Sequence, residues 1–342
     1  MAFISRRNFL IQAGLGLASM APFSSLVHAA MPAYRGATYL TPSYLAVRQG
    51  IDGFVKIATK QSRDHCRIDF FDSATLMKED EQIAGLRDGQ IHFMFHASTY
   101  ITESFPVLGL LGLPTVCSQL IEHPERLALE SPLWKLLNDE LAKQGLFLLA
   151  TGGLFEAEFI WSLDARIASL ADLSGKRMRV VGAEAQETLK QWGVSNIRIP
   201  SAQTFLALQR RTVDAVLANI GTVLARNLHE ALRYCYRLPA TGFCMAIFFL
   251  KQTWDGLPGR TKAAFWEAAQ WYDAHQALTF NTQVCPQEYW PMIKRFGIEV
   301  VSPTESDLRA FDAKSQQVWS WWKGKVGESV GQKALELALG RP

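Results

Sequence analysis

Apolar residues recur along the chain with two periods, one typical of amphipathic helices and one typical of strands. Between residues 44 and 58 they recur about every 3.6 residues, which predicts a helix. Thr41 and Pro42 suit its start, because threonine caps helix N-termini and proline fits the first turn. We expect a βαβαβ run with further strands at 35–40, 67–71 and 91–95 and a second helix at 78–88.

The next part of the chain mixes proline, glycine and leucine before it becomes periodic again. Residues 105–114 predict a loop with one helical turn, and residues 123–143 predict one long helix that a glycine ends. A buried strand is expected at 147–150. Gly152 and Gly153 follow this strand, so we expect the chain to cross there from one half of the molecule to the other.

The second half of the chain repeats the alternation of strands and helices, which predicts another α/β unit. The expected strands are 155–161, 178–181, 196–199, 213–217 and 246–250, and the expected helices are 184–192, 203–210 and 260–282.

Length and charge narrow the class of protein. A chain of 342 residues suggests two lobes, since a single hydrophobic core stops growing at roughly 250 to 300 residues. Hydrophobic residues make up 49% and charged residues 20%, which excludes disordered, collagen-like and coiled-coil proteins. Without Arg6 and Arg7 the chain has 33 basic and 32 acidic side chains. This balance gives no support for binding to nucleic acid or to a membrane surface.

The five cysteines are too few and too scattered for a disulfide scaffold or a CxxC metal site. Buried free thiols are one interpretation. A bridge between Cys235 and Cys244 is the other, and it requires neighbouring strands whose Cα atoms lie within about 7 Å.

The first thirty residues have the features of a twin-arginine (Tat) export signal. Arg6 and Arg7 precede Phe9, an apolar stretch follows, and small residues at the end suit cleavage after Ala29 or Ala30. A membrane anchor is the alternative, but glycines and polar residues interrupt the stretch before it reaches the roughly 20 apolar residues of a spanning helix. We expect residues 1–29 to be removed and the remaining chain to work in the periplasm without spanning the membrane.

Several segments, in order, resemble the solute-binding proteins of tripartite ATP-independent periplasmic (TRAP) transporters, the DctP-like family. The most specific is the sequence DLSGKRMRV at 172–180. The others are the helix 76–89 that ends in glycine, the loop 106–114, Pro200 with 207–209 and the Val213-Asp214 pair, and the sequence WDGLP at 254–258 before a long helix.

The resemblance implies a two-lobed α/β periplasmic binding protein fold with a hinge and a ligand cleft between the lobes. It implies a solute-binding subunit that captures a small organic acid and passes it to the membrane subunits of a TRAP transporter, with no cofactor. It further implies that Arg179 pairs with the ligand carboxylate, a role that suits the planar fork of a guanidinium. The alternative for Arg179 is a structural ion pair with Glu156, Glu158 or Glu184.

The lobes are expected to divide the chain as follows: residues 30–153 with a returning segment near 240–256 form lobe I, and residues 154–239 with contributions from 257–342 form lobe II.

Departures from the family pattern bear on the ligand. Many relatives have an aromatic residue after the proline and then a glutamate, where this chain has Ser201 and Gln203. Their usual asparagine is replaced by Ala218, with Asn219 beside it. Some relatives have a second arginine near Phe159, where this chain has Glu158 as a neighbour. These seven residues, including Arg179, form the predicted site, and a small monocarboxylate fits it better than a sugar acid held by two arginines.

An exported enzyme is the rival hypothesis. The sequence has no HExxH, GxSxG or phosphate-binding loop that would support one. His92 and His96 are four residues apart, but the first falls within a predicted strand, so a helical metal pair is not expected. We interpret the tryptophans at 319, 321 and 322 as helix packing rather than a ligand cage.

Overall fold

The computed structural model describes residues 31–63 and 65–341, so the predicted signal peptide lies outside the described residues. The unit that begins at Pro32 contains two β-sheets, one of five strands and one of six. We call the parts of the molecule built on these two sheets the first lobe and the second lobe. The predicted two-lobed α/β fold is confirmed.

The first lobe has a sheet in which four strands run parallel to one another and one strand, β10, runs antiparallel to them. Its strand order is β2-β1-β3-β10-β4, and β10 runs antiparallel to both of its neighbours. Helix α9 packs against both α1 and β4. The elements are β1 (Ala33–Ala37), α1 (Leu45–Ser62), β2 (Arg67–Phe71), α2 (Gln82–Arg87), β3 (Phe93–Ala97), β4 (Leu146–Ala150), β10 (Met245–Leu250), α8 (Lys251–Gly256) and α9 (Gly259–Thr279).

The second lobe has a sheet with the strand order β11-β9-β5-β8-β6-β7. Strands β6, β7 and β8 are parallel, and β5 runs antiparallel to β8 and β9. The elements are β5 (Glu158–Ser162), β6 (Arg177–Val180), α5 (Ala183–Lys190), β7 (Ser195–Arg198), α6 (Thr204–Gln209), β8 (Ala215–Ala218), α7 (Ile220–Ala225), β9 (Tyr234–Thr241), α10 (Trp290–Arg295) and β11 (Glu299–Val301).

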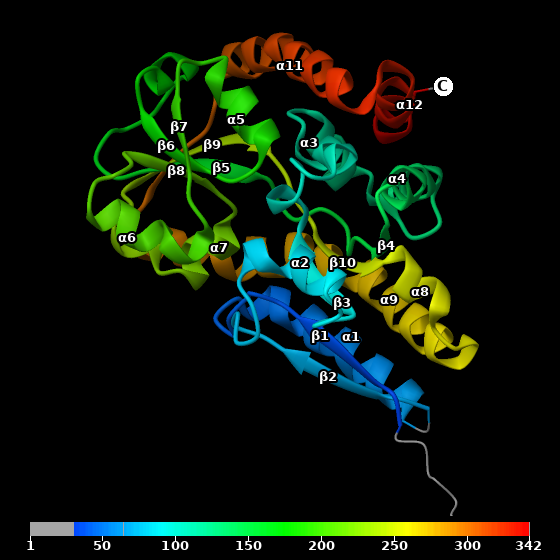
Figure 1. Cartoon of the computed structure of the whole chain (residues 1–342). Helices are drawn as coiled ribbons and strands as arrows, with labels where there is room; N and C mark the ends of the chain where they lie inside the picture. The colour runs from blue at the N-terminus through cyan, green and yellow to red at the C-terminus, as the bar shows by residue number, and fades with distance from the viewer. Residues whose placement is uncertain (1–30, 64, 342) are drawn as a thin grey trace, which may run out of the picture. The chain divides into compact units, whose positions relative to one another are not determined.

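The chain passes between the two sheets three times, at β4 to β5, at β9 to β10 and between β10 and β11. The first passage contains Gly152 and Gly153, whose φ angles of 69° and 75° lie in the left-handed region that glycine adopts without strain. Figure 1 shows β10 between the helices of the first lobe and the strands of the second.

The predicted long helix at 123–143 is wrong. The chain forms α3 (Val116–Glu122), a short 3-10 helix (Pro124–Leu127) and α4 (Pro132–Ala142) instead. Pro132 cannot continue a helix from the preceding turn, and it occupies the first turn of α4, with Ser131 as the N-cap. The loop expected at 105–114 is a 3-10 helix over Pro106–Gly112.

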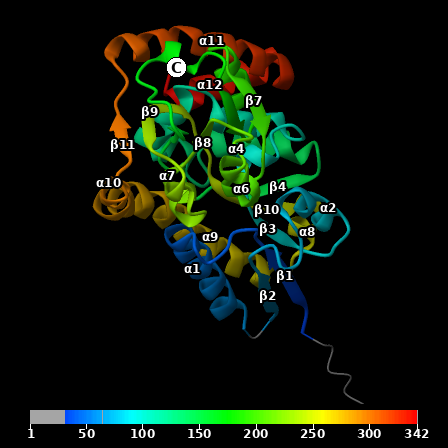
Figure 2. The same cartoon turned by 90° about the vertical axis from the view of Figure 1, so that its left-hand side faces the viewer.

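Two C-terminal helices, α11 (Glu305–Val326) and α12 (Glu328–Leu339), lie away from α1 and β2 in both views (Figures 1 and 2). The indole N–H groups of Trp319 and Trp322 donate to the carbonyl oxygens of Pro114 and Pro106, at 3.0 and 2.7 Å. These tryptophans therefore fix α11 on the 3-10 helix Pro106–Gly112, and the packing interpretation is confirmed for them.

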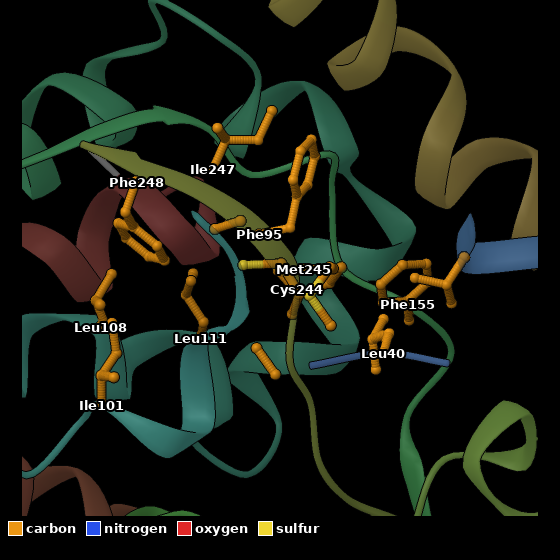
Figure 3. Close-up of a cluster of buried hydrophobic side chains, with 14 of the residues drawn as sticks. Leu40, Phe95, Ile101, Leu108, Leu111, Phe155, Cys244, Met245, Ile247 and Phe248 are labelled. Carbon is orange, nitrogen blue, oxygen red and sulfur yellow. The ribbon is translucent and has the colours of Figure 1, made fainter. Parts of the chain in front are cut away.

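A buried apolar cluster surrounds the passage from β9 to β10. Figure 3 shows Leu40, Phe155 and Met245 in this cluster, with Leu108 and Leu111 from the 3-10 helix close by. Leu40 and Met245 also line the cavity described below, so the core continues directly into its wall. Such packing gives the site a rigid floor, because close-packed side chains have few alternative positions.

The five cysteines, Cys66, Cys117, Cys235, Cys244 and Cys285, are buried free thiols. None of the helices within residues 31–63 and 65–341 has the length and apolar character that a membrane span requires.

Candidate ligand-binding site

A small cavity, which we call the cleft cavity, lies between the two lobes. The space open to the centre of a water-sized sphere is about 40 Å³, roughly three times what one water molecule needs. Side chains from both lobes line it. They belong to Tyr39, Leu40, Tyr44, Val47, Ala97, Thr99, Tyr100, Glu158, Arg179, Val181, Ser201, Asn219, Thr222, Phe243 and Met245, with Gly221 beside them.

Arg179 is buried in β6, with only 2% of its surface exposed. Its Nε donates to the carbonyl oxygen of Ile199 at 2.8 Å, and one terminal nitrogen, Nη1, donates to that of Leu217 at 3.0 Å. These bonds hold the guanidinium plane in one orientation. The other terminal nitrogen, Nη2, has no hydrogen-bond partner among the described residues, so donors remain for a ligand.

The predicted alternative role of Arg179, a structural ion pair, is not what the structure shows. Within residues 31–63 and 65–341 no carboxylate approaches the Arg179 guanidinium to within 4.0 Å. Glu156 pairs with Arg237 instead, at 2.9 Å. Buried charges in proteins are normally paired, because the loss of hydration is otherwise not compensated. Arg179 is therefore a buried cation beside a cavity, with no ion-pair partner within 4.0 Å among the described residues.

Glu158 is the second charged residue of the cleft cavity. Burial raises the pKa of its carboxyl group from 4.5 to about 7, while the Arg179 charge and the backbone N–H of Asn219 act in the opposite direction. The sheet explains their proximity. Phe159 lies opposite Ala218, and Arg179 lies opposite Val216, so Glu158 and Arg179 both lie near the carboxyl end of β8. Ligand sites in α/β sheets commonly occur at the carboxyl ends of parallel strands.

Two further predicted residues, Ser201 and Asn219, also line the cleft cavity. The Asn219 side chain has structural partners: its Oδ1 accepts from the Gly221 N–H at 2.8 Å and caps α7, and its Nδ2 donates to the Glu156 carbonyl at 2.5 Å. The Ser201 N–H donates to the Tyr100 hydroxyl at 2.9 Å. Asn219 thus shapes the cavity wall rather than offering a free amide.

The structure does not bring Phe159, Gln203 and Ala218 to the cleft cavity. Successive side chains of a strand point to opposite faces, so Phe159 turns away from the side of Glu158 and packs on Trp290, with ring centroids 5.6 Å apart. Gln203 is exposed at the start of α6. Ala218 is fully buried.

The first-lobe residues of the cavity were missed by the sequence analysis. Tyr39 follows β1, while Thr99 and Tyr100 follow β3, and β1 and β3 are parallel neighbours. Their position directly after parallel strands was a usable signal, because the carboxyl ends of such strands meet at one edge of the sheet.

Hydrogen bonds also connect the lobes across the cavity. The Tyr44 hydroxyl of the first lobe accepts from Arg226 Nε of the second lobe at 3.0 Å, and the guanidinium lies 5.1 Å from the Tyr44 ring centroid. Together with the bond between Tyr100 and Ser201, this contact holds the lobes in a closed arrangement.

The histidine pair forms no metal site. His96 is buried in β3, and its ring nitrogens bond to the carbonyl oxygens of Glu79 and Ala97 at 2.9 and 3.0 Å. The Nδ1 of His92 accepts from the Arg35 N–H at 2.9 Å. No cluster of three or more potential metal ligands occurs in the part of the chain that the structure describes.

Two α/β lobes joined by three passages of the chain, with a small cavity between them, are the architecture of a solute-binding protein. The model of bacterial extracellular solute-binding proteins, family 7 (DctP), matches residues 38–325, and the chain belongs to this family. This confirms the predicted family. The 2,3-diketo-L-gulonate-binding periplasmic protein of Escherichia coli is 24% identical over 272 residues, which cover 78% of this chain and 79% of that protein.

Solved structures share the fold at low sequence identity. An extracytoplasmic solute receptor of Bordetella pertussis that binds pyroglutamic acid superimposes with a TM-score of 0.78 at 19% identity, covering 90% of this chain and 99% of that one. The sugar acid binding protein of Advenella mimigardefordensis, in complex with galactonate, gives 0.77 at 21% identity, with 90% and 98% covered. The family and these neighbours are solute-binding receptors rather than enzymes.

Proposed function

We propose that this protein is the periplasmic solute-binding subunit of a TRAP transporter and that it captures a small organic acid whose carboxylate pairs with Arg179. The observation that supports this most is the buried, unpaired guanidinium of Arg179 at the cleft cavity. A carboxylate matches its planar donors, and the closed cavity would strengthen the interaction by excluding water. The relatives that bind small acids agree with this proposal.

The small volume and the second charged residue favour a compact monocarboxylate. Glu158 would repel a second carboxylate placed near Arg179, and no second arginine lines the cleft cavity among the described residues. A sugar acid held by two arginines is therefore disfavoured.

The proposal includes delivery of the acid to the membrane subunits and export through the Tat pathway with removal of residues 1–29. It also assigns residues 30–153 and 240–256 to lobe I and residues 154–239 to lobe II. Because α9 packs on α1 and β4, we assign this helix to lobe I rather than lobe II, whereas β11 joins the sheet of lobe II.

A thermal-shift screen of the purified protein against small carboxylic acids tests the binding function. A ligand at a hundredfold excess over its Kd stabilises the folded state by about 2.7 kcal/mol. We expect a compact monocarboxylate to raise the melting temperature, while uncharged amides of the same acids leave it unchanged. Failure of every acid to bind would overturn the proposal.

Export is tested separately. Replacing both Arg6 and Arg7 by lysine should leave unprocessed precursor in the cytoplasm. Normal appearance of a processed periplasmic form would exclude the Tat route without affecting the binding function.

A further inference from the structure

The carboxyl group of Glu158 lies at the cleft cavity, and its hydrogen-bonding capacity is only partly used by other residues. It forms no ion pair within 4.0 Å in the described part of the chain, and it accepts a hydrogen bond from the backbone N–H of Asn219. A carboxylate has two oxygens with room for about four hydrogen bonds. Most of its acceptor capacity is therefore available to a ligand.

The other polar groups of the cavity cannot take over this acceptor role as well. Both polar atoms of the Asn219 side chain are used, and the hydroxyls of Tyr44 and Tyr100 already accept hydrogen bonds from Arg226 and Ser201. The hydroxyls of Thr99 and Thr222 can act as donors or acceptors. When ionised, Glu158 is the one lining side chain in the described residues that can only accept.

An acid bound to Arg179 would bring its own carboxylate towards Glu158. Two carboxylates at one site repel each other unless a proton or a donor group lies between them. A ligand with an N–H or O–H group on the atom next to its carboxyl carbon would supply that donor. A charge-assisted hydrogen bond to the Glu158 carboxylate would then replace the repulsion.

We propose that Glu158 determines specificity: it accepts a hydrogen bond from an N–H or O–H group beside the ligand carboxylate, while Arg179 holds the carboxylate itself. The preferred ligands are compact lactam, 2-amino or 2-hydroxy acids. This inference rests on the proposed function, since it requires that Arg179 binds a carboxylate in the cleft cavity.

Pairs of acids with and without the donor test the inference by calorimetric titration at pH 8. The main probes are pyroglutamate against 5-oxotetrahydrofuran-2-carboxylate, which exchanges a ring N–H for an oxygen at equal charge, and 2-hydroxypropanoate against 2-methoxypropanoate. Proline against tetrahydrofuran-2-carboxylate is a third pair, in which the donor is an ammonium group that also adds a positive charge. We expect the donor-bearing member of at least one pair to bind about 10- to 100-fold more tightly, which is the usual effect of one hydrogen bond to a charged group.

Two variants locate the acceptor. Glu158→Leu should reduce the ratio within the pair to less than about threefold, because it removes every acceptor. Glu158→Gln should also lower it, since the amide can turn and donate to the ring oxygen of the donor-free acid. The second variant preserves the shape of the site and serves if the first does not fold. Asp164→Asn removes one exposed carboxylate that pairs with Arg211, and it should leave the ratio unchanged.

The outcomes separate this inference from the proposed function. If no acid binds the wild-type protein, both are overturned. If acids bind and Arg179→Ala weakens them, but the pairs bind equally or the Glu158 variants keep the ratio, the specificity role is wrong and the proposed function stands. A preference for the donor-free acids would also overturn it, because Glu158 would then be acting as a protonated donor. If the ratio depends on Glu158 but binding survives Arg179→Ala, the donor recognition stands and the carboxylate role of Arg179 is wrong.

Discussion

The second lobe has two pairs of a guanidinium and a carboxyl group near β5, and the two pairs differ in their interactions. The inner pair is Arg179 and Glu158, and the outer pair is Arg237 and Glu156. In the outer pair, Arg237 binds Glu156 at 2.9 Å, and its guanidinium lies 4.4 Å from the Trp290 ring centroid. The Trp290 indole N–H completes the set by donating to Glu156 at 3.0 Å. In the cleft cavity, Arg179 and Glu158 have no such contact with each other.

The difference separates a structural ion pair from a binding site. The outer pair satisfies its own charges, and its arginine side chain is 46% exposed, so water can hydrate what the protein does not. The two charged groups of the inner pair are shielded from water, and neither forms an ion pair within 4.0 Å among the described residues. A protein keeps such groups when a ligand completes them, since unpaired buried charge otherwise lowers stability. The comparison predicts that changes to the inner pair alter affinity, while changes to the outer pair alter stability.

The largest effect is expected for Arg179→Ala. It would leave the ligand carboxylate unpaired in the closed cavity, which typically costs about 2 to 5 kcal/mol, or roughly 30-fold to several thousandfold in Kd. Arg179→Lys keeps the charge but loses the planar fork, so its loss should be intermediate. Calorimetric titration with an acid found in the screen measures both.

The Arg179→Ala variant should melt at nearly the temperature of the ligand-free wild type. The carbonyl groups of Ile199 and Leu217 that lose their donor can form hydrogen bonds with water in the cavity. An early-melting Arg179→Ala protein with normal affinity would show that Arg179 is structural and would remove the contrast between the two pairs.

The second effect concerns pH. The carboxyl group of Glu158 has a pKa of about 7 in the folded protein against 4.5 ordinarily, so the folded state holds its proton to higher pH than the unfolded chain. Stability therefore falls as pH rises from about 4.5 to 7, by at most about 3 kcal/mol. Besides Arg179 and the Asn219 N–H, the Cys117 thiol of α3 faces this carboxyl group.

Glu158→Gln removes the titrating group and should raise the free energy of unfolding at pH 8 but not at pH 4. Denaturant unfolding of ligand-free protein at both values measures the difference. An equal change at pH 4 and pH 8 would show that Glu158 titrates normally and is well hydrated, contrary to the view of the inner pair as poorly hydrated.

Much of this arrangement could be predicted from the sequence, and what could not was decided by tertiary contacts. The strand 67–71 was predicted with its observed limits because its apolar run is short and bounded. Arg179 was found through a motif that places an arginine within a strand. That none of Glu156, Glu158 and Glu184 would form an ion pair with it could not be predicted, since β9 brings Arg237 to Glu156 from 81 residues away.

The first-lobe wall shows the same limit. Tyr39 and Thr99 carry no motif, and only the parallel pairing of β1 with β3 brings them together. Phe159 was placed in the site because it is adjacent to Glu158 in sequence, but the alternation of side chains along a strand puts neighbours on opposite faces. The short strand β11 and the helix α7 were not predicted, because three- and six-residue elements give too little periodicity.

The outer pair provides the converse prediction to Arg179→Ala. Arg237→Ala removes an ion pair and the cation–π contacts of Arg237 and takes the cationic partner from Glu156, which should lower the free energy of unfolding by about 1 to 2 kcal/mol. Because Arg237 does not line the cleft cavity, the Kd of the acid should stay within about twofold of the wild type. A tenfold weaker affinity in the folded variant would mean that the inner and outer pairs are coupled.

The smallest effect is expected at the contact that closes the cavity. Tyr44→Phe removes the hydroxyl that accepts from Arg226 but keeps the ring on which the guanidinium lies. One hydrogen bond contributes about 0.5 to 1.5 kcal/mol to the closed arrangement, so the fraction of closed molecules should fall and the apparent Kd should rise by about 2- to 10-fold. Small-angle scattering should show a larger radius of gyration without ligand and compaction to the wild-type value at saturating acid.

Tyr34→Phe is the matched control, because Tyr34 packs on His92 and Phe265 within the first lobe and lies outside the cleft cavity. If Tyr44→Phe changed the affinity without changing the radius in either state, Tyr44 would act on the ligand directly. The cleft cavity would then bind its acid with groups of both lobes. Ligand binding could no longer be assigned to the inner pair alone, with Tyr44 only holding the lobes together.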